Sequence, residues 1–237
     1  MIRAIVFDLD NTLVDFMTMK RLAVAAAVEA MIDAGLPLDR QTAEREIFDI
    51  YEREGIEYQN VFDDLLAEQL GQVDYRMLAA GVVAYRRARE AALVVYPHVT
   101  FTLVSLIKRG IRIAVVSDAP RREAWLRLCY LNLHHLIDVV VTFEDTGERK
   151  PSPAPFRLVL QRLGIEPREA LMVGDWAERD VVGAMQLGMR TAFARYGDTF
   201  GTVASGADFD LDDIHQLLDI VTELNAGGVA EAPGEEA

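Results

Sequence analysis

Two aspartates stand one residue apart where an apolar run near the start of the chain ends. Ala4 to Leu9 reads AIVFDL, and Asp8-Leu9-Asp10-Asn11-Thr12 follows its apolar part. In an extended strand, the side chains of residues 8 and 10 project to the same side. Two like charges this close are costly unless protons or a cation hold them. A hard divalent metal such as Mg²⁺, the usual choice beside a phosphate, is one solution; a simple turn at residues 10–12 is the alternative.

Further polar residues end a second apolar run, IRIAVVS, which closes at Ser117. A hydroxyl at a strand end can bind a phosphoryl oxygen, and it can equally cap the next helix. Asp118 follows, and a second carboxylate near a phosphate is unfavourable. We therefore expect either that the Asp118 side chain points away, as a helix cap, or that its backbone N–H is the group that binds phosphate.

A lysine in the middle of the chain precedes a proline, in Glu148-Arg149-Lys150-Pro151-Ser152-Pro153. The helical conformation is disfavoured directly before proline, so we place Lys150 on a loop. A fixed ammonium there could balance the carboxylates and hold a transferring phosphoryl group. An ordinary exposed loop lysine is the alternative.

A second pair of acidic residues follows the apolar run ALMVG: Asp175, in Gly174-Asp175-Trp176, and, further on, Asp180. Gly174 allows a tight backbone turn, and Asp175 would make a good third oxygen ligand for a metal. Asp180 could bind the metal through water or hold Lys150. Alternatively, both acids are favoured by the dipole at a helix N-terminus.

Short β-branched runs position these residues, and helical patterns separate the runs. Such alternation indicates a doubly wound α/β sheet of parallel strands buried on both faces. The predicted strands are Ala4–Leu9, Ile111–Ser117, Val139–Phe143, Ala170–Gly174 and Arg190–Ala194. The predicted helices between them are Val99–Arg109, Arg121–Asn132, Ala154–Leu163 and Glu178–Leu187, three of which stop at a glycine.

The long segment between the first two strands has a different pattern. It predicts four helices, the first ending near Gly35 and the others spanning Asp39–Glu54, Val61–Leu70 and Asp74–Ala92. A helical block inserted after the first strand should lie above the carboxyl edge of the sheet, where ligands bind. We interpret 15–95 as a cap, 1–14 with 96–224 as the α/β core, and 225–237 as a disordered tail.

Composition limits the partners. The chain has 237 residues, 51% of them hydrophobic, and a formal net charge of −14. That charge repels nucleic acid and anionic lipid, so we expect neither as a partner. No apolar run approaches the roughly 20 residues of a membrane span, and a cytoplasmic protein is expected. The single cysteine, Cys129, is predicted to be a small core residue.

Taken in order, DxDxT after a buried strand, a serine at a strand end, KPxPxxF ending at Phe156, and the Gly-Asp segment resemble the motifs of the haloacid dehalogenase superfamily. The resemblance covers the core, 1–14 and 96–224. The inserted segment resembles the family in its position and its helical nature. The resemblance implies a Rossmann-like α/β core with a helical cap. It also implies a Mg²⁺-dependent phosphatase acting on a small soluble phosphate monoester.

The resemblance also implies a role for each matching residue. Asp8 would be the nucleophile that takes up the phosphoryl group. Asp10 would protonate the leaving alcohol and then act as general base. Mg²⁺ would be held by Asp8, the backbone carbonyl of Asp10, and Asp175.

The remaining matching residues would bind the phosphate or support the residues that do. Ser117, Lys150 and the backbone N–H of Asp118 would hold the phosphate oxygens. Asp180 and Thr12 would support the residues that contact metal and substrate. The partner would be a small phosphorylated metabolite, and the chain a monomer or homodimer.

Three other functions stay open at this point. A haloacid dehalogenase would share Asp8 but would not need Asp10, Asp175 or Asp180. A phosphosugar mutase would keep Asp8 and Asp10 and release no free phosphate. A non-catalytic interaction protein would have no need of all four motifs.

Overall fold

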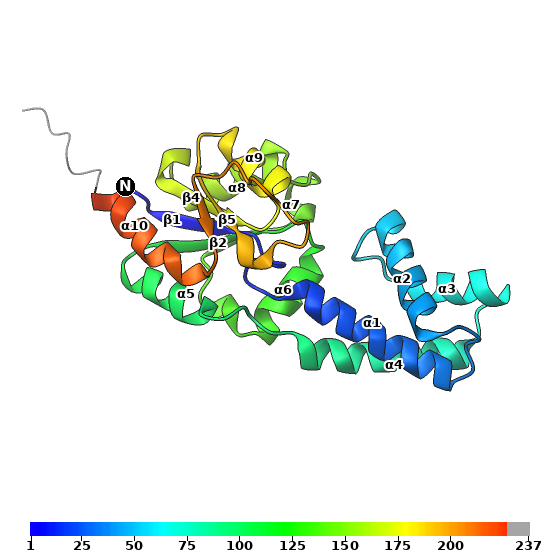
Figure 1. Cartoon of the computed structure of the whole chain (residues 1–237). Coiled ribbons are helices and arrows are strands. Elements are labelled where there is room, and N and C mark those ends of the chain that lie inside the picture. Colours follow the sequence, from blue (N-terminus) through cyan, green and yellow to red (C-terminus); the bar gives the residue numbers. More distant parts are fainter. Residues whose placement is uncertain (227–237) are drawn as a thin grey trace, which may run out of the picture. The chain divides into compact units, whose positions relative to one another are not determined.

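The computed structural model describes residues 1–226 (Figure 1). The chain divides into two compact units, one made of Met1–Asp15 with the chain from Val95 onward, and the other of Phe16–Val94. The expected division at 14/15 and 95/96 lies within one residue of these boundaries. Most of the predicted tail, positions 227–237, lies outside the described residues, and helix α10 extends through Ala226.

The first unit is built on a parallel sheet. Within the described residues it has six strands in the order β3-β2-β1-β4-β5-β6, and each neighbouring pair is parallel. The strands are β1 (Ala4–Phe7), β2 (Arg112–Val116), β3 (Val139–Val141), β4 (Ala170–Gly174), β5 (Arg190–Ala194) and β6 (Phe209–Leu211). The α/β fold with a doubly wound parallel sheet, predicted from the sequence, is thereby confirmed, and β6 is an addition to it.

Helices cover both faces of this sheet (Figure 1). They are α5 (Val99–Lys108), α6 (Arg121–Tyr130), α7 (Phe143–Thr146), α8 (Pro153–Leu163), α9 (Val182–Met185) and α10 (Leu217–Ala226). Short 3₁₀ turns occupy Leu133–His135, Pro167–Glu169, Arg195–Gly197 and Ile214–Gln216.

Alternation along the strands explains why both faces need cover. All four residues of β1 are buried, and successive side chains of a strand point to opposite faces. Ala4 and Val6 belong to a core cluster with Phe156 and Val159 of α8. Helices α5 and α10, which contact each other, lie on the other side of the sheet (Figure 1).

The second unit consists of four helices within Phe16–Val94, as the sequence predicts. They are α1 (Phe16–Asp33), α2 (Arg40–Glu54), α3 (Val61–Leu70) and α4 (Tyr75–Ala92). Asp39 caps α2 by accepting a hydrogen bond from the Thr42 backbone N–H, and Asp74 caps α4 in the same way. The unit has its own apolar core, which includes Val28, Met31, Ile47 and Leu65. The four helices therefore bury apolar side chains against one another. Its role as a cap stays a prediction.

Two sequence-based expectations about helices are wrong. Cys129 is exposed, not part of the core. The buried face of α6 is formed by Glu123, Ala124, Arg127 and Leu128, which leaves Cys129 on the outer face. The helix expected over Glu178–Leu187 is instead a π-helical turn at Ala177–Val181 followed by the short helix α9.

None of the helices in residues 1–226 combines the length and the apolar character needed to cross a bilayer.

Candidate active site

The polar residues singled out in the sequence gather at the carboxyl edge of the sheet. Asp8 follows β1, Ser117 follows β2 and Asp175 follows β4, and β1 is hydrogen-bonded to both β2 and β4. The chain winds outward from β1 to β3 and then crosses back to β4. This reversal of strand order creates the place where open α/β sheets bind ligands.

Lys150 lies at the centre of the site, on the loop between α7 and α8. Its ammonium donates hydrogen bonds to Oδ1 of Asp8 and, at 2.6 Å, to Oδ1 of Asp180. Lys150 is 4% exposed, so both contacts are shielded from water. The alternative of an ordinary exposed loop lysine is excluded.

Three buried carboxylates surround this ammonium. Asp8, Asp175 and Asp180 each offer an oxygen, and these oxygens all lie within 4.8 Å of one another. Three carboxylates against one ammonium leave a negative excess when all are ionised, and buried like charges are costly unless compensated. Hard oxygen donors in a negatively charged site suit a divalent cation such as Mg²⁺. The donor set therefore fits a metal.

The pKa values reflect the same charge excess. Burial raises the pKa of Asp8 to about 7, although Lys150 opposes the rise; Asp180 and Asp10 add to it. Burial, together with the charges of Asp8 and Asp180, raises the pKa of Asp175 well above its usual range. Burial alone would lower the pKa of Lys150, but Asp180 and Asp8 outweigh it and raise that pKa, so Lys150 stays an ammonium.

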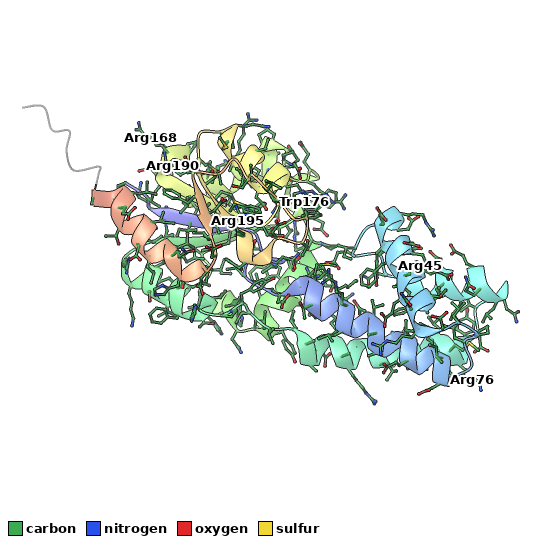
Figure 2. All side chains as sticks on the ribbon, viewed as in Figure 1. Arg45, Arg76, Arg168, Trp176, Arg190 and Arg195 are labelled. Atoms are coloured by element: carbon green, nitrogen blue, oxygen red, sulfur yellow. The ribbon has the colours of Figure 1, made fainter. Side chains whose placement is uncertain are left out.

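Asp180 is held from two sides. One carboxylate oxygen accepts from Lys150, and the other accepts from the backbone N–H of Trp176 at 3.1 Å. Trp176 lies on the loop after β4 (Figure 2). A Cβ at Gly174 would lie 2.2 Å from Oδ2 of Asp180. The glycine before Asp175 is thus required because the Asp180 side chain packs directly on its backbone.

The loop after β1 is fixed by equally close contacts. Thr12 donates a hydrogen bond from Oγ1 to Oδ1 of Asp175 at 3.1 Å. Asn11 has a φ of 60°, which asparagine tolerates better than most residues. A Cβ at Gly197 would lie 1.6 Å from the carbonyl oxygen of Asn11. The segment after β5 therefore packs on this loop backbone to backbone.

Neither Ser117 nor Asp118 caps the helix that follows, a role that the sequence allowed for both. The Ser117 hydroxyl accepts from the Ala119 backbone N–H at 3.1 Å, and the N-cap position of α6 is Pro120. The Asp118 carboxylate accepts from the Lys150 backbone N–H at 3.0 Å and from the Arg179 guanidinium at 3.1 Å. Asp118 thus ties the Lys150 loop to the Asp175 segment.

One residue of the site was missed in the sequence. Arg127 of α6 is 2% exposed, and its guanidinium donates to Oδ2 of Asp10 at 2.7 Å. Arg127 lies four residues after Glu123, and both are on the buried face of the helix. Two opposite charges four residues apart, on one face of the helix, were the available signal.

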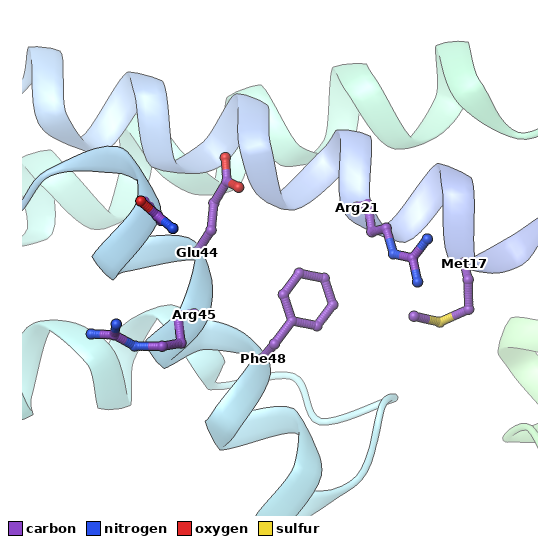
Figure 3. Close-up of a pocket in the computed structure, with 6 residues that line it drawn as sticks. Met17, Arg21, Glu44, Arg45 and Phe48 are labelled. Carbon is purple, nitrogen blue, oxygen red and sulfur yellow. The ribbon is translucent and has the colours of Figure 1, made fainter. Parts of the chain in front are cut away.

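A hollow of about 440 Å³ lies in the second unit, between α1 and α2 (Figure 3). Met17, Arg21, Gln41, Glu44, Arg45 and Phe48 line it. Phe48 points from α2 toward α1, and Arg45 points away from Arg21. None of these lining residues belongs to the four motifs, and the carboxylates described above all lie in the first unit.

Comparison with known proteins agrees with this geometry. The family model for haloacid dehalogenase-like hydrolases matches residues 2–188. The chain belongs to this family. Relatives include a glyceraldehyde 3-phosphate phosphatase of Methanocaldococcus jannaschii, 34% identical over 94% of this chain and 99% of the relative. A phosphoglycolate phosphatase of Aquifex aeolicus is 29% identical over 82% of this chain and 85% of its own length.

A solved structure gives the same picture of the fold. The crystal structure of a HAD phosphatase from Thermococcus onnurineus superimposes with a TM-score of 0.68 at 25% identity and covers 93% of this chain and 98% of its own. The family membership inferred from the motifs is confirmed.

Proposed function

We propose that this hydrolase is a Mg²⁺-dependent phosphatase that cleaves a small phosphate monoester through a phosphorylated Asp8. The observation that carries the proposal is the buried cluster around Lys150, where Asp8, Asp175 and Asp180 leave a negative excess next to one ammonium. Such a cluster accepts a divalent cation and, with it, a phosphate dianion.

In the first step, a carboxylate oxygen of Asp8 attacks the phosphorus of the ester. The bond from phosphorus to the ester oxygen breaks, and Asp10 donates a proton to the departing alkoxide. Lys150 and the Ser117 hydroxyl hold the transferring phosphoryl oxygens. Mg²⁺, held by Asp8, Asp175 and the Asp10 carbonyl, would supply positive charge that offsets the charge of phosphate and carboxylates.

In the second step, water attacks the phosphorus of the Asp8 phosphate. Asp10, now ionised, takes the proton of that water, and the bond between phosphorus and Asp8 breaks. Inorganic phosphate leaves, and Asp8 is again a free carboxylate with a protonated Asp10 beside it. The sum is one ester and one water converted to one alcohol and one phosphate.

The relatives support a short substrate. The two relatives are named for glyceraldehyde 3-phosphate and phosphoglycolate, which are both small monoesters with a second polar group. We propose a substrate of this class, with glyceraldehyde 3-phosphate as the first candidate because its named relatives align with nearly all of this chain.

The test is phosphate release from glyceraldehyde 3-phosphate, phosphoglycolate and acetyl phosphate, each with Mg²⁺ or with EDTA. The wild type should release phosphate with Mg²⁺ and not with EDTA, and Asp8→Asn should be inactive. The matched control is Asp212→Asn, because Asp212 is exposed and lies outside the site. Activity that survives Asp8→Asn would contradict the proposal. A phosphoryl group moved to another hydroxyl of the substrate, without release of free phosphate, would identify a mutase instead.

A further inference from the structure

The first unit contains a partly buried ion pair that the mechanism above does not use. The Arg127 guanidinium lies 2.7 Å from Oδ2 of Asp10, and the Arg127 side chain is 2% exposed against 21% for Asp10. Arg127 comes from α6, which follows β2, whereas Asp10 comes from the loop after β1. The contact therefore joins two elements that the sheet places side by side.

Burying an arginine at position 127 costs free energy. Removing a guanidinium from water costs free energy that a structural role could avoid with an apolar side chain of similar size. The buried face of α6 carries the apolar Ala124 and Leu128 as well as the charged Glu123, so apolar side chains do pack on this face. The guanidinium is instead directed at the one carboxyl group that must move protons in both chemical steps.

We infer that Arg127 is a positioning residue for proton transfer by Asp10. Arg127 holds Oδ2, and this fixes the rotamer of Asp10 so that Oδ1 is the oxygen that exchanges the proton with the leaving alkoxide and later with water. Arginine suits the task because its planar guanidinium fixes direction as well as distance, whereas an ammonium acts as a point charge. This inference rests on the proposed phosphatase activity.

The chemistry provides a test that a structural role would not pass. An alkoxide is a poor leaving group and needs the proton of Asp10, whereas acetate leaves from acetyl phosphate without one. The value of kcat/KM includes the step that expels the leaving group. Loss of the correct Asp10 position should therefore lower kcat/KM for the ester far more than kcat/KM for acetyl phosphate. A general loss of folded protein would lower both values equally.

The experiment measures kcat/KM for glyceraldehyde 3-phosphate and for acetyl phosphate on Arg127→Met, Arg127→Lys and the wild type. Arg127→Met should lower the value for the ester by about 100-fold and that for acetyl phosphate by less than about 5-fold, since a positioned acid contributes 10²–10⁴. Arg127→Lys keeps the positive charge but not the planar guanidinium, so its kcat/KM for the ester should lie between those of the wild type and Arg127→Met. The control is Arg122→Met, at an exposed position of the same helix.

Both values are measured on the same preparation, so their ratio does not depend on how much of a variant is folded. An equal loss for the two substrates in Arg127→Met would overturn the inference. Combining Arg127→Met with Asp10→Ala should give the same ratio as Asp10→Ala alone, because residues that act through one another are not additive; a further change in the ratio would also overturn it. Failure of the phosphatase proposal looks different, since the wild type would then release no phosphate.

Discussion

At the scale of single residues, the site is a balance of charge. Lys150 is bonded to Asp8 and Asp180, and Asp175 stands next to them without an ammonium of its own. Buried carboxylates in this state resist ionisation, which is why burial raises the pKa of Asp8 and that of Asp175. Occupancy by a cation and protonation of these carboxylates are therefore competing ways to relieve the same repulsion.

This competition predicts how stability depends on pH. The pKa of Asp8 is about 7 in the folded chain against 3.8 as its ordinary value. Between these values the folded state binds more protons than the unfolded state, so the free energy of unfolding of the metal-free chain should fall as the pH rises. The measurement is thermal unfolding in EDTA at about pH 5 and about pH 7.5, for the wild type and for Asp8→Asn. The difference between the two proteins removes the contribution of groups outside the site.

Magnesium should reverse the trend. It should raise the unfolding temperature more at about pH 7.5 than at about pH 5, because protonated carboxylates do not bind it. Asp175→Asn should remove most of that increase, and Asp212→Asn should leave it unchanged. An increase that is equal at the two pH values would show that Mg²⁺ acts outside this cluster.

Asp118 gives a second prediction at this scale. It accepts from the Lys150 backbone N–H and from Arg179, so we expect it to position Lys150 and not to contact phosphate with its carboxylate. Asp118→Ala should lower kcat by about 30-fold, because it removes two hydrogen bonds that are each worth about 1 kcal/mol. Asp118→Asn keeps an acceptor and should stay within about 3-fold. If the carboxylate faced the substrate instead, Asp118→Asn would lower KM by removing repulsion.

At the scale of elements, close backbone packing sets the geometry of the loops. The turn after β5 lies against the loop after β1 at Gly197, where a Cβ would meet the Asn11 carbonyl oxygen at 1.6 Å. Neither partner is the end of a flexible side chain, so neither can move aside cheaply. Two loops that are far apart in the sequence are thus fixed to each other at one glycine.

Gly197→Ala should therefore damage both stability and catalysis. We expect a loss of more than about 2 kcal/mol in the free energy of unfolding, as for other overpacked sites, and loss of phosphate release because Asn11 follows Asp10 directly. The comparison is Gly188→Ala, where φ is +80° and nothing lies within 4 Å of the added Cβ. That change should cost about 1–2 kcal/mol of backbone strain and leave kcat unchanged. Equal losses of stability and of kcat in Gly197→Ala and Gly188→Ala would contradict the claim that close packing at Gly197 fixes the two loops.

At the scale of the whole molecule, two units with separate cores share one chain. The core around Ile47 belongs to the second unit, whereas Ile113 of β2 is buried in the first. The carboxylate cluster lies entirely in the first unit. Stability of the two units should therefore respond differently to ligand.

Ile47→Ala and Ile113→Ala test this separation. Each should cost about 2–5 kcal/mol, as for a fully buried isoleucine. In scanning calorimetry, the transition that Mg²⁺ shifts upward should be lowered by Ile113→Ala and left in place by Ile47→Ala. A transition that both changes lower equally would mean that the units unfold as one.

Much of this arrangement follows from local sequence, and the exceptions have physical reasons. Two strands and the helix Val61–Leu70 were predicted to the residue, because buried runs and glycine stops are local signals. Strand β6 reads Phe-Asp-Leu and contains no apolar run to detect. Cys129 was assigned to the core from apolar neighbours, but which face of α6 is buried depends on packing that composition does not encode.

The site shows the same division. The motifs predict that Asp8, Lys150 and Asp175 come together, because each ends or follows a strand of one parallel sheet. The contact between Arg127 and Asp10 could not be predicted in this way, since it depends on the rotation of a helix about its own axis. The two partners of Asp118 likewise follow from loop conformations and not from a periodic pattern.

The position of β1 in the middle of the sheet has a consequence for synthesis on the ribosome. One neighbour of β1 is β2, and the other is β4, which begins only at Ala170. Until β4 has emerged, one edge of this fully buried strand has open N–H and C=O groups, and such edges invite pairing with other chains. The last strand to reach β1 also brings Asp175, so the carboxylates that we propose to hold a cation come together only when this edge is covered.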